Sequence, residues 1–177
     1  HPQDIDCIEA HGTGTPVADP IEVNALNNIF SKSHSKENPL YISSVKTNIG
    51  HLESASGVAS IIKSILSLQS NQIFKHLNFS KLNPNITLEN SVIPLNKIDF
   101  PKKKKPRNIG VSSFGFSGAN AHLILQESPQ VNKKLYVADT CNREKFLTIS
   151  AKTDNALNSL IENYKDYLKT TDNLFSD

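Results

Sequence analysis

The fold of this chain is decided by Ser44-Val45-Lys46-Thr47-Asn48-Ile49-Gly50-His51-Leu52-Glu53, which places a cation, an imidazole and a carboxylate within eight residues beside a glycine. The preceding residues, 40–45, are rich in β-branched and aromatic side chains and predict a strand. After it, residues 58–68 carry apolar side chains at 58, 61, 62, 65 and 66, the spacing of a buried helical face. We therefore expect the charged cluster on a strand-to-helix turn, where an open α/β sheet places its chemistry.

A less specific interpretation of the same residues stays open. Lys46 and Glu53 could form a surface ion pair, and His51 could be an ordinary loop histidine, because isolated groupings of these residues often occur by chance. The other motifs of the chain decide between the two interpretations.

Length and composition favour a soluble domain of ordinary size with an appendage. Of the 177 residues, 37% are hydrophobic and 20% are charged, which does not indicate disorder. No apolar run approaches the roughly 20 residues that cross a bilayer, so no membrane span is expected. The net charge of +2 is too small to indicate a nucleic-acid partner. The basic run 102–105 lies between two prolines and predicts a solvated loop.

The number of cysteines indicates the redox compartment, and the absence of methionine indicates whether the sequence is part of a longer chain. Cys7 and Cys141 are too few and too far apart to predict disulfides or a zinc site, which favours a reducing, cytoplasmic compartment. The N-terminal residues do not have the pattern of a signal peptide. The sequence contains no methionine, so we expect a piece of a longer polypeptide or a product whose beginning is missing.

The N-terminal segment predicts another strand that ends near a histidine. Residues 5–10 alternate like a short strand and lead into a turn at 11–16 that contains glycine and proline, so His11 is expected in a loop. A helix is expected to begin with Asp19 as the capping residue, followed by a proline and then by Glu22 at the third position. Its predicted apolar stripe comprises Ile21, Ala25, Leu26, Ile29 and Phe30.

The middle of the chain predicts a hairpin after an irregular stretch. A strand is expected at 72–79, and 82–106 is expected to be irregular because four prolines interrupt it. Strands at 109–114 and 121–126 should then pair through the glycine-containing turn between them.

The composition changes after a boundary near 128–131. A short strand is expected at 146–150, and an amphipathic helix is expected from Asp154 onward. The apolar face of this helix comprises Leu157, Leu160, Ile161, Tyr164 and Leu168.

Three segments together resemble one family. They are Glu9–Thr15 with Asp19–Glu22, then Lys46–Glu53, then Gly110–His122, and their order and spacing match as well. All resemble the C-terminal half of the β-ketoacyl synthase (ketosynthase) domain of type I polyketide synthases, over residues 1–128. Residues 129–177 resemble the start of the linker between the ketosynthase and acyltransferase domains.

The resemblance implies an α/β chain of the thiolase-like fold. Residues 1–128 would supply its C-terminal half as a βαβαββ arrangement, followed by a small α/β linker segment. The family catalyses decarboxylative Claisen condensation between an acyl chain on a cysteine and a malonyl-type unit on an acyl carrier protein. Two histidines serve the decarboxylation, and the resemblance maps them onto His11 and His51, whose N–H groups would stabilise the enolate oxygen.

The same resemblance assigns supporting roles around the two histidines. Lys46 and Glu53 match a pair that orients the imidazole at position 51. Thr13 and Thr15 match positions that contact the phosphopantetheine arm of the carrier protein. No cofactor is expected to bind the chain directly, and no metal is expected.

The resemblance also assigns roles to two residues of the hairpin, and the sequence differs from the family at three positions. Phe116 matches an aromatic gate beside the nucleophile, with its backbone amide as a candidate oxyanion donor, and Asn120 is expected to brace the loop. Ser117 and Ala119 stand where glycine and threonine are more usual, and Ala18 replaces another glycine. All three are small, so the loops are expected to persist.

The nucleophile of the family has no counterpart in this sequence. Cys7 lies within a predicted strand and Cys141 in the tail, and neither has the small-residue context of that cysteine. The isolated segment is therefore expected to be inactive. The expected partners are the N-terminal half of the ketosynthase, an acyl carrier protein, an acyltransferase domain and a second copy in a homodimer.

Two alternatives remain at this point. A metal-dependent hydrolase could use His11, His51 and Glu53, although the sequence has neither a helical His-x-x-x-His pair nor a cysteine pair. The chain could also belong to a truncated, catalytically inactive polyketide synthase-like protein, or act only in forming an interface.

Overall fold

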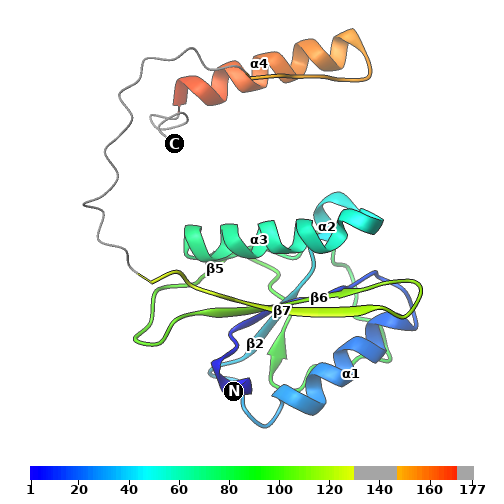
Figure 1. The fold of residues 1–177 in the computed structure, drawn as a ribbon, viewed down its shortest axis with the longest axis vertical. Helices are drawn as coiled ribbons and strands as arrows, with labels where there is room; N and C mark the ends of the chain where they lie inside the picture. The colour runs from blue at the N-terminus through cyan, green and yellow to red at the C-terminus, as the bar shows by residue number, and fades with distance from the viewer. Residues whose placement is uncertain (130–146, 171–177) are drawn as a thin grey trace. The chain divides into compact units, whose positions relative to one another are not determined.

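The computed structural model describes residues 1–129 and 147–170. The chain divides into two compact units, His1–Pro129 and Gln130–Asp177, and each is described by itself. The first unit is an α/β domain, and the described part of the second is dominated by one helix (Figure 1).

A five-stranded sheet forms the centre of the first unit, in the order β4-β2-β1-β6-β7. Its strands are β1 (Cys7–Glu9), β2 (Leu40–Ser43), β4 (Ser91–Val92), β6 (Asn108–Phe114) and β7 (Asn120–Gln126). The pairs β1·β2, β1·β6 and β2·β4 are parallel, whereas β6 and β7 form the predicted antiparallel hairpin. The prediction of an α/β class is confirmed.

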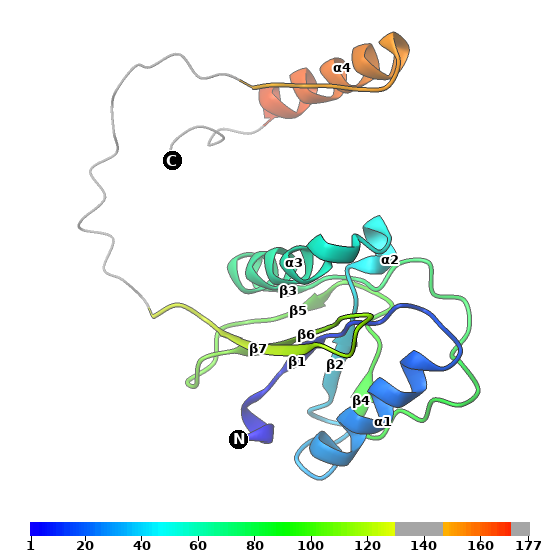
Figure 2. The same cartoon turned by 45° about the vertical axis from the view of Figure 1, so that its right-hand side comes forward.

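Helices cover both faces of this sheet (Figure 2). Helix α1 (Ala18–Phe30) connects β1 to β2 on one face, and α3 (Ser56–Ser70) follows β2 on the other. The short helix α2 (Lys46–Ile49) and the 3-10 turn η2 (Glu53–Ala55) lie between β2 and α3, and a further 3-10 turn, η1 (Pro2–Asp4), precedes β1. This arrangement confirms that Lys46–Glu53 lies between a strand and a helix.

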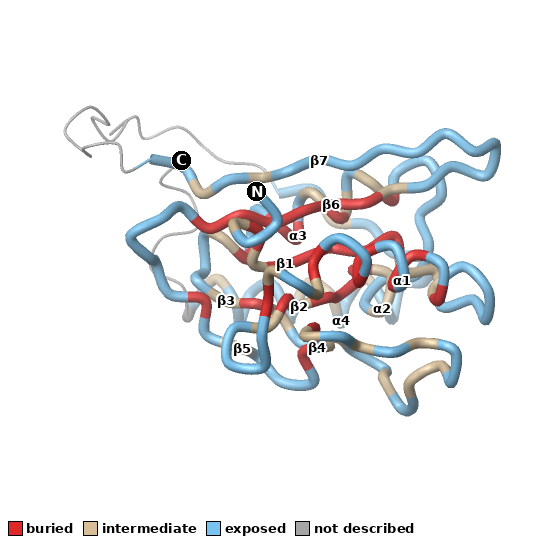
Figure 3. The backbone as a smooth tube through the Cα atoms, turned by 90° about the horizontal axis from the view of Figure 1, so that it is seen from below, coloured by how far each residue is buried: buried red, intermediate tan, exposed pale blue. Residues whose placement is uncertain are grey.

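The core lies on both sides of β1, β2 and β6, the buried strands in Figure 3. The cluster on one side comprises Ile5, Ile8, Ala10, Leu26, Phe30, Leu40 and Ile42. The other comprises Cys7, Ile73, Phe100, Ile109 and Val111. Strand β7 is exposed along most of its length.

The predicted start and stripe of α1 were partly wrong. The helix begins at Ala18, and its N-cap residue makes no side-chain capping hydrogen bond. Asp19 instead accepts a hydrogen bond from Gly14 N–H at 3.0 Å, because the glycine-rich loop folds back over the first helical turn. Leu26 and Phe30 are buried as predicted, whereas Ile21, Ala25 and Ile29 are exposed.

The predicted buried face of α3 was also largely wrong. Its apolar side chains Val58, Ile62, Ile65 and Leu66 are exposed, and only Ile61 of the predicted face packs against the core. The buried residues of the helix are Ser56, Ser60, Lys63, Ser64 and Ser67. Because serine side chains are small, the face of α3 that carries them lies close to the sheet. Most of the apolar face that was predicted to be buried therefore points away from the sheet.

The stretch between α3 and the hairpin contains short strands. Only Gln72–Ile73 of the predicted strand 72–79 is extended, as β3, and it pairs with β5 (Ile98–Asp99). The predicted irregular stretch therefore contributes β4 and β5.

Lysines of the predicted solvated loop lie against carboxylates of neighbouring segments. Lys103 Nζ lies 2.6 Å from Asp6, and Lys105 Nζ lies 3.1 Å from Asp4. The loop is exposed as predicted, and these ion pairs hold it near the N-terminus of the unit.

In the second unit, α4 (Asp154–Thr170) confirms the predicted amphipathic helix. The strand predicted at 146–150 was wrong for 147–150, which have no regular structure, and Phe146 lies outside the described residues. Within 1–129 and 147–170, no helix combines the length and the apolar character needed to cross a membrane.

Arg107 links the end of the sheet to two loops and predicts a measurable stability loss. The side chain is fully buried, donates two 2.9 Å hydrogen bonds to Glu127, and also donates to the backbone carbonyls of Phe100 and Leu68. Arg107→Ala should lower the free energy of unfolding by about 3 kcal/mol, because these acceptors lose a buried partner. Urea unfolding followed by circular dichroism measures this loss.

The control is Lys105→Ala, which removes a solvent-exposed ion pair near the same end of the sheet. It should leave the unfolding free energy nearly unchanged. Equal losses for the two variants would contradict the structural role assigned to Arg107.

Candidate active site

The structure brings His11 and His51 into direct contact. His11 follows the end of β1, and His51 lies in the loop between α2 and η2. Their ring centroids are 5.4 Å apart with the ring planes at 84°, an edge-on arrangement. The His11 side chain is buried and that of His51 is exposed, so the pair opens from the carboxyl end of the sheet towards the surface.

Backbone amides determine which ring nitrogen of each histidine carries the proton. Phe114 N–H donates to His11 Nδ1 at 3.4 Å, and Glu53 N–H donates to His51 Nδ1 at 2.9 Å. In a neutral imidazole, a nitrogen that accepts a hydrogen bond leaves the proton on the other one. Both rings are therefore assigned the Nε2–H tautomer, with Nε2 free to donate to a ligand.

The surroundings of His11 favour its neutral form. Burial lowers the pKa of the imidazole, and the positive charge of Lys46 and the neighbouring His51 ring lower it further. The ring also lies 5.3 Å from the Phe114 ring, which shields it on one side. At neutral pH, His11 is thus a hydrogen-bond donor that carries no charge.

Glu22 holds the loop that carries His11. Its carboxylate accepts hydrogen bonds from the backbone N–H groups of His11 and Gly12, each at 2.9 Å, and burial raises its pKa. Gly12 has φ +45°, and a Cβ there would lie 2.8 Å from Ser44 Cβ, so this position requires glycine. The sequence pattern predicts Glu22 only as the third residue of a helix start and does not indicate its hydrogen bonds to the His11 loop.

The predicted supporting pair does not form an ion pair. No salt bridge of the described residues joins Lys46 to Glu53, which also removes the alternative of a surface ion pair between them. Burial lowers the pKa of Lys46, and the nearby carboxylates of Glu9 and Glu22 oppose this shift. Glu53 contacts His51 through its backbone N–H.

The threonines predicted to contact a carrier arm lie on the exposed loop after His11. Their hydroxyl oxygens are 3.3 Å apart, and Thr15 Oγ1 accepts a hydrogen bond from Ala18 N–H at 3.2 Å. Thr13 and Thr15 thus present hydroxyl groups on a loop that Asp19 and Glu22 anchor to α1.

The other two predicted residues lie on the hairpin. Phe116 occupies its tip and is fully exposed, and Asn120 begins β7 opposite Phe114. The tip is closed by a hydrogen bond from Gly118 N–H to the Gly115 carbonyl at 3.0 Å. Because Phe114 also contacts His11, the hairpin is tied to the histidine pair at its base.

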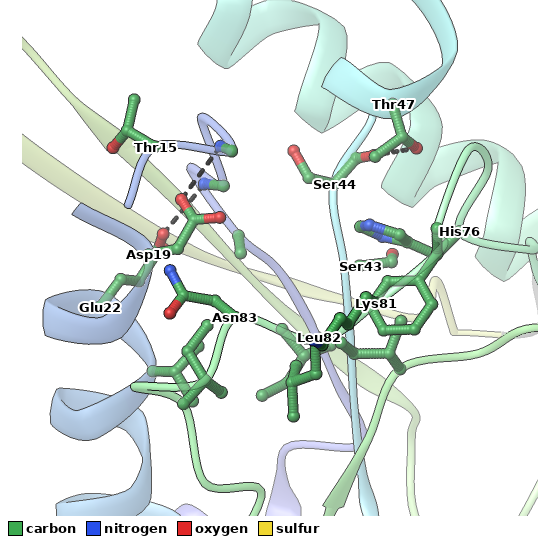
Figure 4. Close-up of a pocket in the computed structure, with 18 of the residues that line it drawn as sticks. Thr15, Asp19, Glu22, Ser43, Ser44, Thr47, His76, Lys81, Leu82 and Asn83 are labelled. Atoms are coloured by element: carbon green, nitrogen blue, oxygen red, sulfur yellow. Dashed lines mark hydrogen bonds between the residues drawn. The ribbon is translucent and has the colours of Figure 1, made fainter. Parts of the chain in front are cut away.

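A cleft of about 670 Å³ lies next to the loop that follows β1 and is lined by Ala10 and Gly12, the neighbours of His11 (Figure 4). Its walls are the loop at 12–16, the start of α1, the end of β2 and the segment 76–86. Thr15, Ser44 and Thr47 contribute hydroxyl groups, and burial lowers the pKa of His76 on the opposite wall. The rings of His11 and His51 do not line this cleft.

The structure shows whether Cys7 could act as the nucleophile. Burial raises the pKa of Cys7 to about 12, so its sulfur stays a thiol at neutral pH and is a poor nucleophile. Cys141 lies outside the described residues. Over 1–129 and 147–170, no group of three or more His, Cys, Asp or Glu side chains is arranged to hold a metal ion.

Comparisons with known families divide the chain shortly after β3. Residues 1–80 match the family described as "Beta-ketoacyl synthase, C-terminal domain", and residues 83–176 match "Ketoacyl-synthetase C-terminal extension". Together they account for most of the sequence.

Curated relatives are large polyketide synthases. The chain is 51% identical over 131 residues to probable polyketide synthase 17 of Dictyostelium discoideum. It is 43% identical over 163 residues to probable polyketide synthase 26 of the same organism. These matches cover 73% and 90% of this chain but only 5% and 6% of the relatives, so the chain spans a small part of their length.

Solved ketosynthases have the same fold. Ketosynthase twelve of the bacillaene polyketide synthase from Bacillus amyloliquefaciens superposes with a TM-score of 0.70 at 32% identity. The match covers 98% of this chain and 29% of that ketosynthase. The thiolase-like fold expected from the sequence is confirmed.

The buried thiol of Cys7 predicts resistance to alkylation. In folded protein at pH 7.5, iodoacetamide should modify Cys7 at least tenfold more slowly than in urea, because thiolate formation and access are both suppressed. Peptide mapping by mass spectrometry measures the labelling of this cysteine by itself. Equal rates in the two conditions would show that Cys7 is reactive in the fold.

Proposed function

Because this chain belongs to the β-ketoacyl synthase family of polyketide synthases, we propose that residues 1–128 supply the two catalytic histidines of a condensing ketosynthase. Residues 129–177 then begin the linker towards an acyltransferase domain. The observation that carries the proposal is the His11–His51 ring contact, in which a backbone amide occupies Nδ1 of each ring.

The proposed reaction begins with loss of carbon dioxide from a malonyl-type thioester. The bond between the carboxylate carbon and the α-carbon breaks, and its electron pair forms an enolate whose charge lies on the thioester oxygen. The Nε2–H groups of His11 and His51 donate hydrogen bonds to that oxygen. Removing one such donor costs on the order of 10²–10³ in rate in comparable sites.

The carbanion then attacks the acyl thioester on a cysteine of the N-terminal half. A carbon–carbon bond forms, the carbon–sulfur bond breaks, and the cysteine leaves as a thiolate. Cys7 does not take this role because its buried sulfur remains protonated. The isolated segment is therefore inactive in this proposal.

The residues around the histidines position the substrate. Thr13 and Thr15 offer hydroxyl groups to the phosphopantetheine arm of an acyl carrier protein, and their loop is anchored to α1. The exposed ring of Phe116 acts as the gate beside the acylated cysteine, and Asn120 braces the hairpin. Lys46 acts on His11 through its charge, and Glu53 orients His51 through its backbone.

The exposed apolar face of α3 supports the proposal that the N-terminal half of the ketosynthase packs against this chain. Val58, Ile62, Ile65 and Leu66 are between 40% and 58% exposed, and the helix begins shortly after His51. A second half that covers this face would lie next to the loop that carries His51. The other proposed partners are an acyltransferase domain and an acyl carrier protein. The intact enzyme is proposed to be a homodimer in the cytoplasm.

The same exposed face of α3 is also consistent with the alternative of a catalytically inactive or interface-forming protein. It differs from the condensing enzyme in one measurable respect, since it predicts no decarboxylation even when the whole synthase is present.

Substitution of the histidines tests the proposal. In the full-length synthase, His11→Ala and His51→Ala should each slow CO2 release from a malonyl-loaded carrier protein on the order of 10²-fold, because each removes one donor to the enolate oxygen. Radiolabelled CO2 release measures the rate. The control is His76→Ala, in the neighbouring cleft, which should stay within a few-fold of wild type. Unchanged rates for both histidine variants would exclude the proposed roles.

The lowered pKa of His11 predicts where the reaction fails in acid. Protonation of Nδ1 would place its hydrogen against Phe114 N–H and disturb the ring orientation. Since the neutral form is favoured in the folded protein, the rate should hold as pH falls to 6.5, the ordinary histidine value, and decline only below it. A pH–rate profile of CO2 release, compared with that of His11→Gln, measures this limb. A decline centred above 6.5 would contradict the assignment.

A further inference from the structure

A buried charge pair lies directly before the loop that carries His11. Lys63 Nζ lies 2.8 Å from Glu9 Oε2, and the two side chains are 10% and 3% exposed. Lys63 also donates to Ser43 Oγ at 2.9 Å, and the Ser43 hydroxyl donates to the same Glu9 oxygen at 3.1 Å. We refer to these three residues as the Glu9 cluster.

The Glu9 cluster joins the elements that carry the candidate active site. Glu9 ends β1, two residues before His11, and Ser43 ends β2. The second carboxylate oxygen of Glu9 accepts a hydrogen bond from Val45 N–H, directly before Lys46 begins α2. Lys63 approaches from α3, the helix that follows the His51 loop. One carboxylate therefore bonds to β2, to the start of α2 and to α3.

Stability alone gives little reason for charges at this position. A buried ion pair loses its hydration, and apolar side chains of similar volume often hold a fold as well or better. Charged hydrogen bonds differ from apolar contacts in fixing direction and distance. At the ends of β1 and β2, that directionality sets how the two histidine loops lie relative to each other.

We propose that Glu9 and Lys63 are positioning residues for the condensing reaction, which fix the spacing of the His11 and His51 rings without touching the substrate. The inference rests on the function proposed above. It assigns a role to two side chains that sequence analysis did not single out. The available signal was a charged residue in an apolar strand and a lysine on the serine-rich face of a helix.

The expected kinetic effect is a loss of kcat at constant KM. The loop with Thr13 and Thr15 is held by Asp19 and Glu22, which are not part of the Glu9 cluster. Binding of the carrier arm should therefore persist when the cluster is removed. The decarboxylation step, which needs both rings on one oxygen, should slow.

The test replaces both charges together in the full-length synthase. Glu9→Leu with Lys63→Met keeps similar volume and leaves no unpaired buried charge. We expect kcat for CO2 release from a malonyl-loaded carrier protein to fall at least tenfold, with KM within twofold of wild type. The thermal unfolding midpoint is measured alongside.

The matched control is Arg107→Met with Glu127→Leu, which removes the ion pair between the buried Arg107 and the partly buried Glu127 in the same domain. This control should keep wild-type kcat even if its unfolding midpoint falls. If both double variants keep wild-type kcat, or lose it in proportion to their loss of stability, the positioning role is wrong. If the wild-type synthase releases no CO2, the proposed function itself fails, and the positioning role fails with it.

A milder variant decides the question if Glu9→Leu with Lys63→Met does not fold. Ser43→Ala leaves both charges in place and removes only the hydroxyl that joins them. It should lower kcat several-fold at an unchanged unfolding midpoint and KM. A wild-type kcat for Ser43→Ala would overturn the proposal.

Discussion

Parallel pairing of β1 with β2 is the constraint on which the rest of this structure depends. The register places Glu9 opposite Ser43, so the two strands end at the same level of the sheet. Parallel strands direct their following loops to one edge, where ligands of open α/β sheets bind. His11 and the segment from Lys46 to His51 are distant in sequence and meet because of this register.

Three buried or partly buried carboxylates hold the domain together, two at that edge and one near the opposite ends of the strands. Glu9 accepts from a lysine, a serine and a backbone amide, and Glu22 accepts from two amides of the His11 loop. Glu127 binds the fully buried Arg107 near the opposite ends of the strands. A buried carboxylate without such donors would be costly, so these contacts fix the positions of their loops as well as satisfying the charge.

Helix α3 shows how a domain that is one part of a larger fold can mislead an argument from periodicity. Its apolar spacing predicts a helix correctly, yet serines and one lysine face the sheet, and most of the apolar side chains face outward. Periodicity reports that a helix has an apolar side but does not report which neighbour covers it. In a chain that spans 29% of a solved ketosynthase, the covering neighbour can lie outside the sequence at hand.

The sequence by itself determined the family, the α/β class, the loop at 11–16, the hairpin and the helix α4, because each motif or element behind them is formed by residues that are near one another in the chain. It also indicated His11 and His51 as partners through the resemblance. Only the tertiary structure decided that Glu22 holds the His11 loop, that Glu53 contacts His51 through its backbone, and which face of α3 is buried. These features depend on hydrogen bonds and packing between segments far apart in sequence, which local patterns do not record.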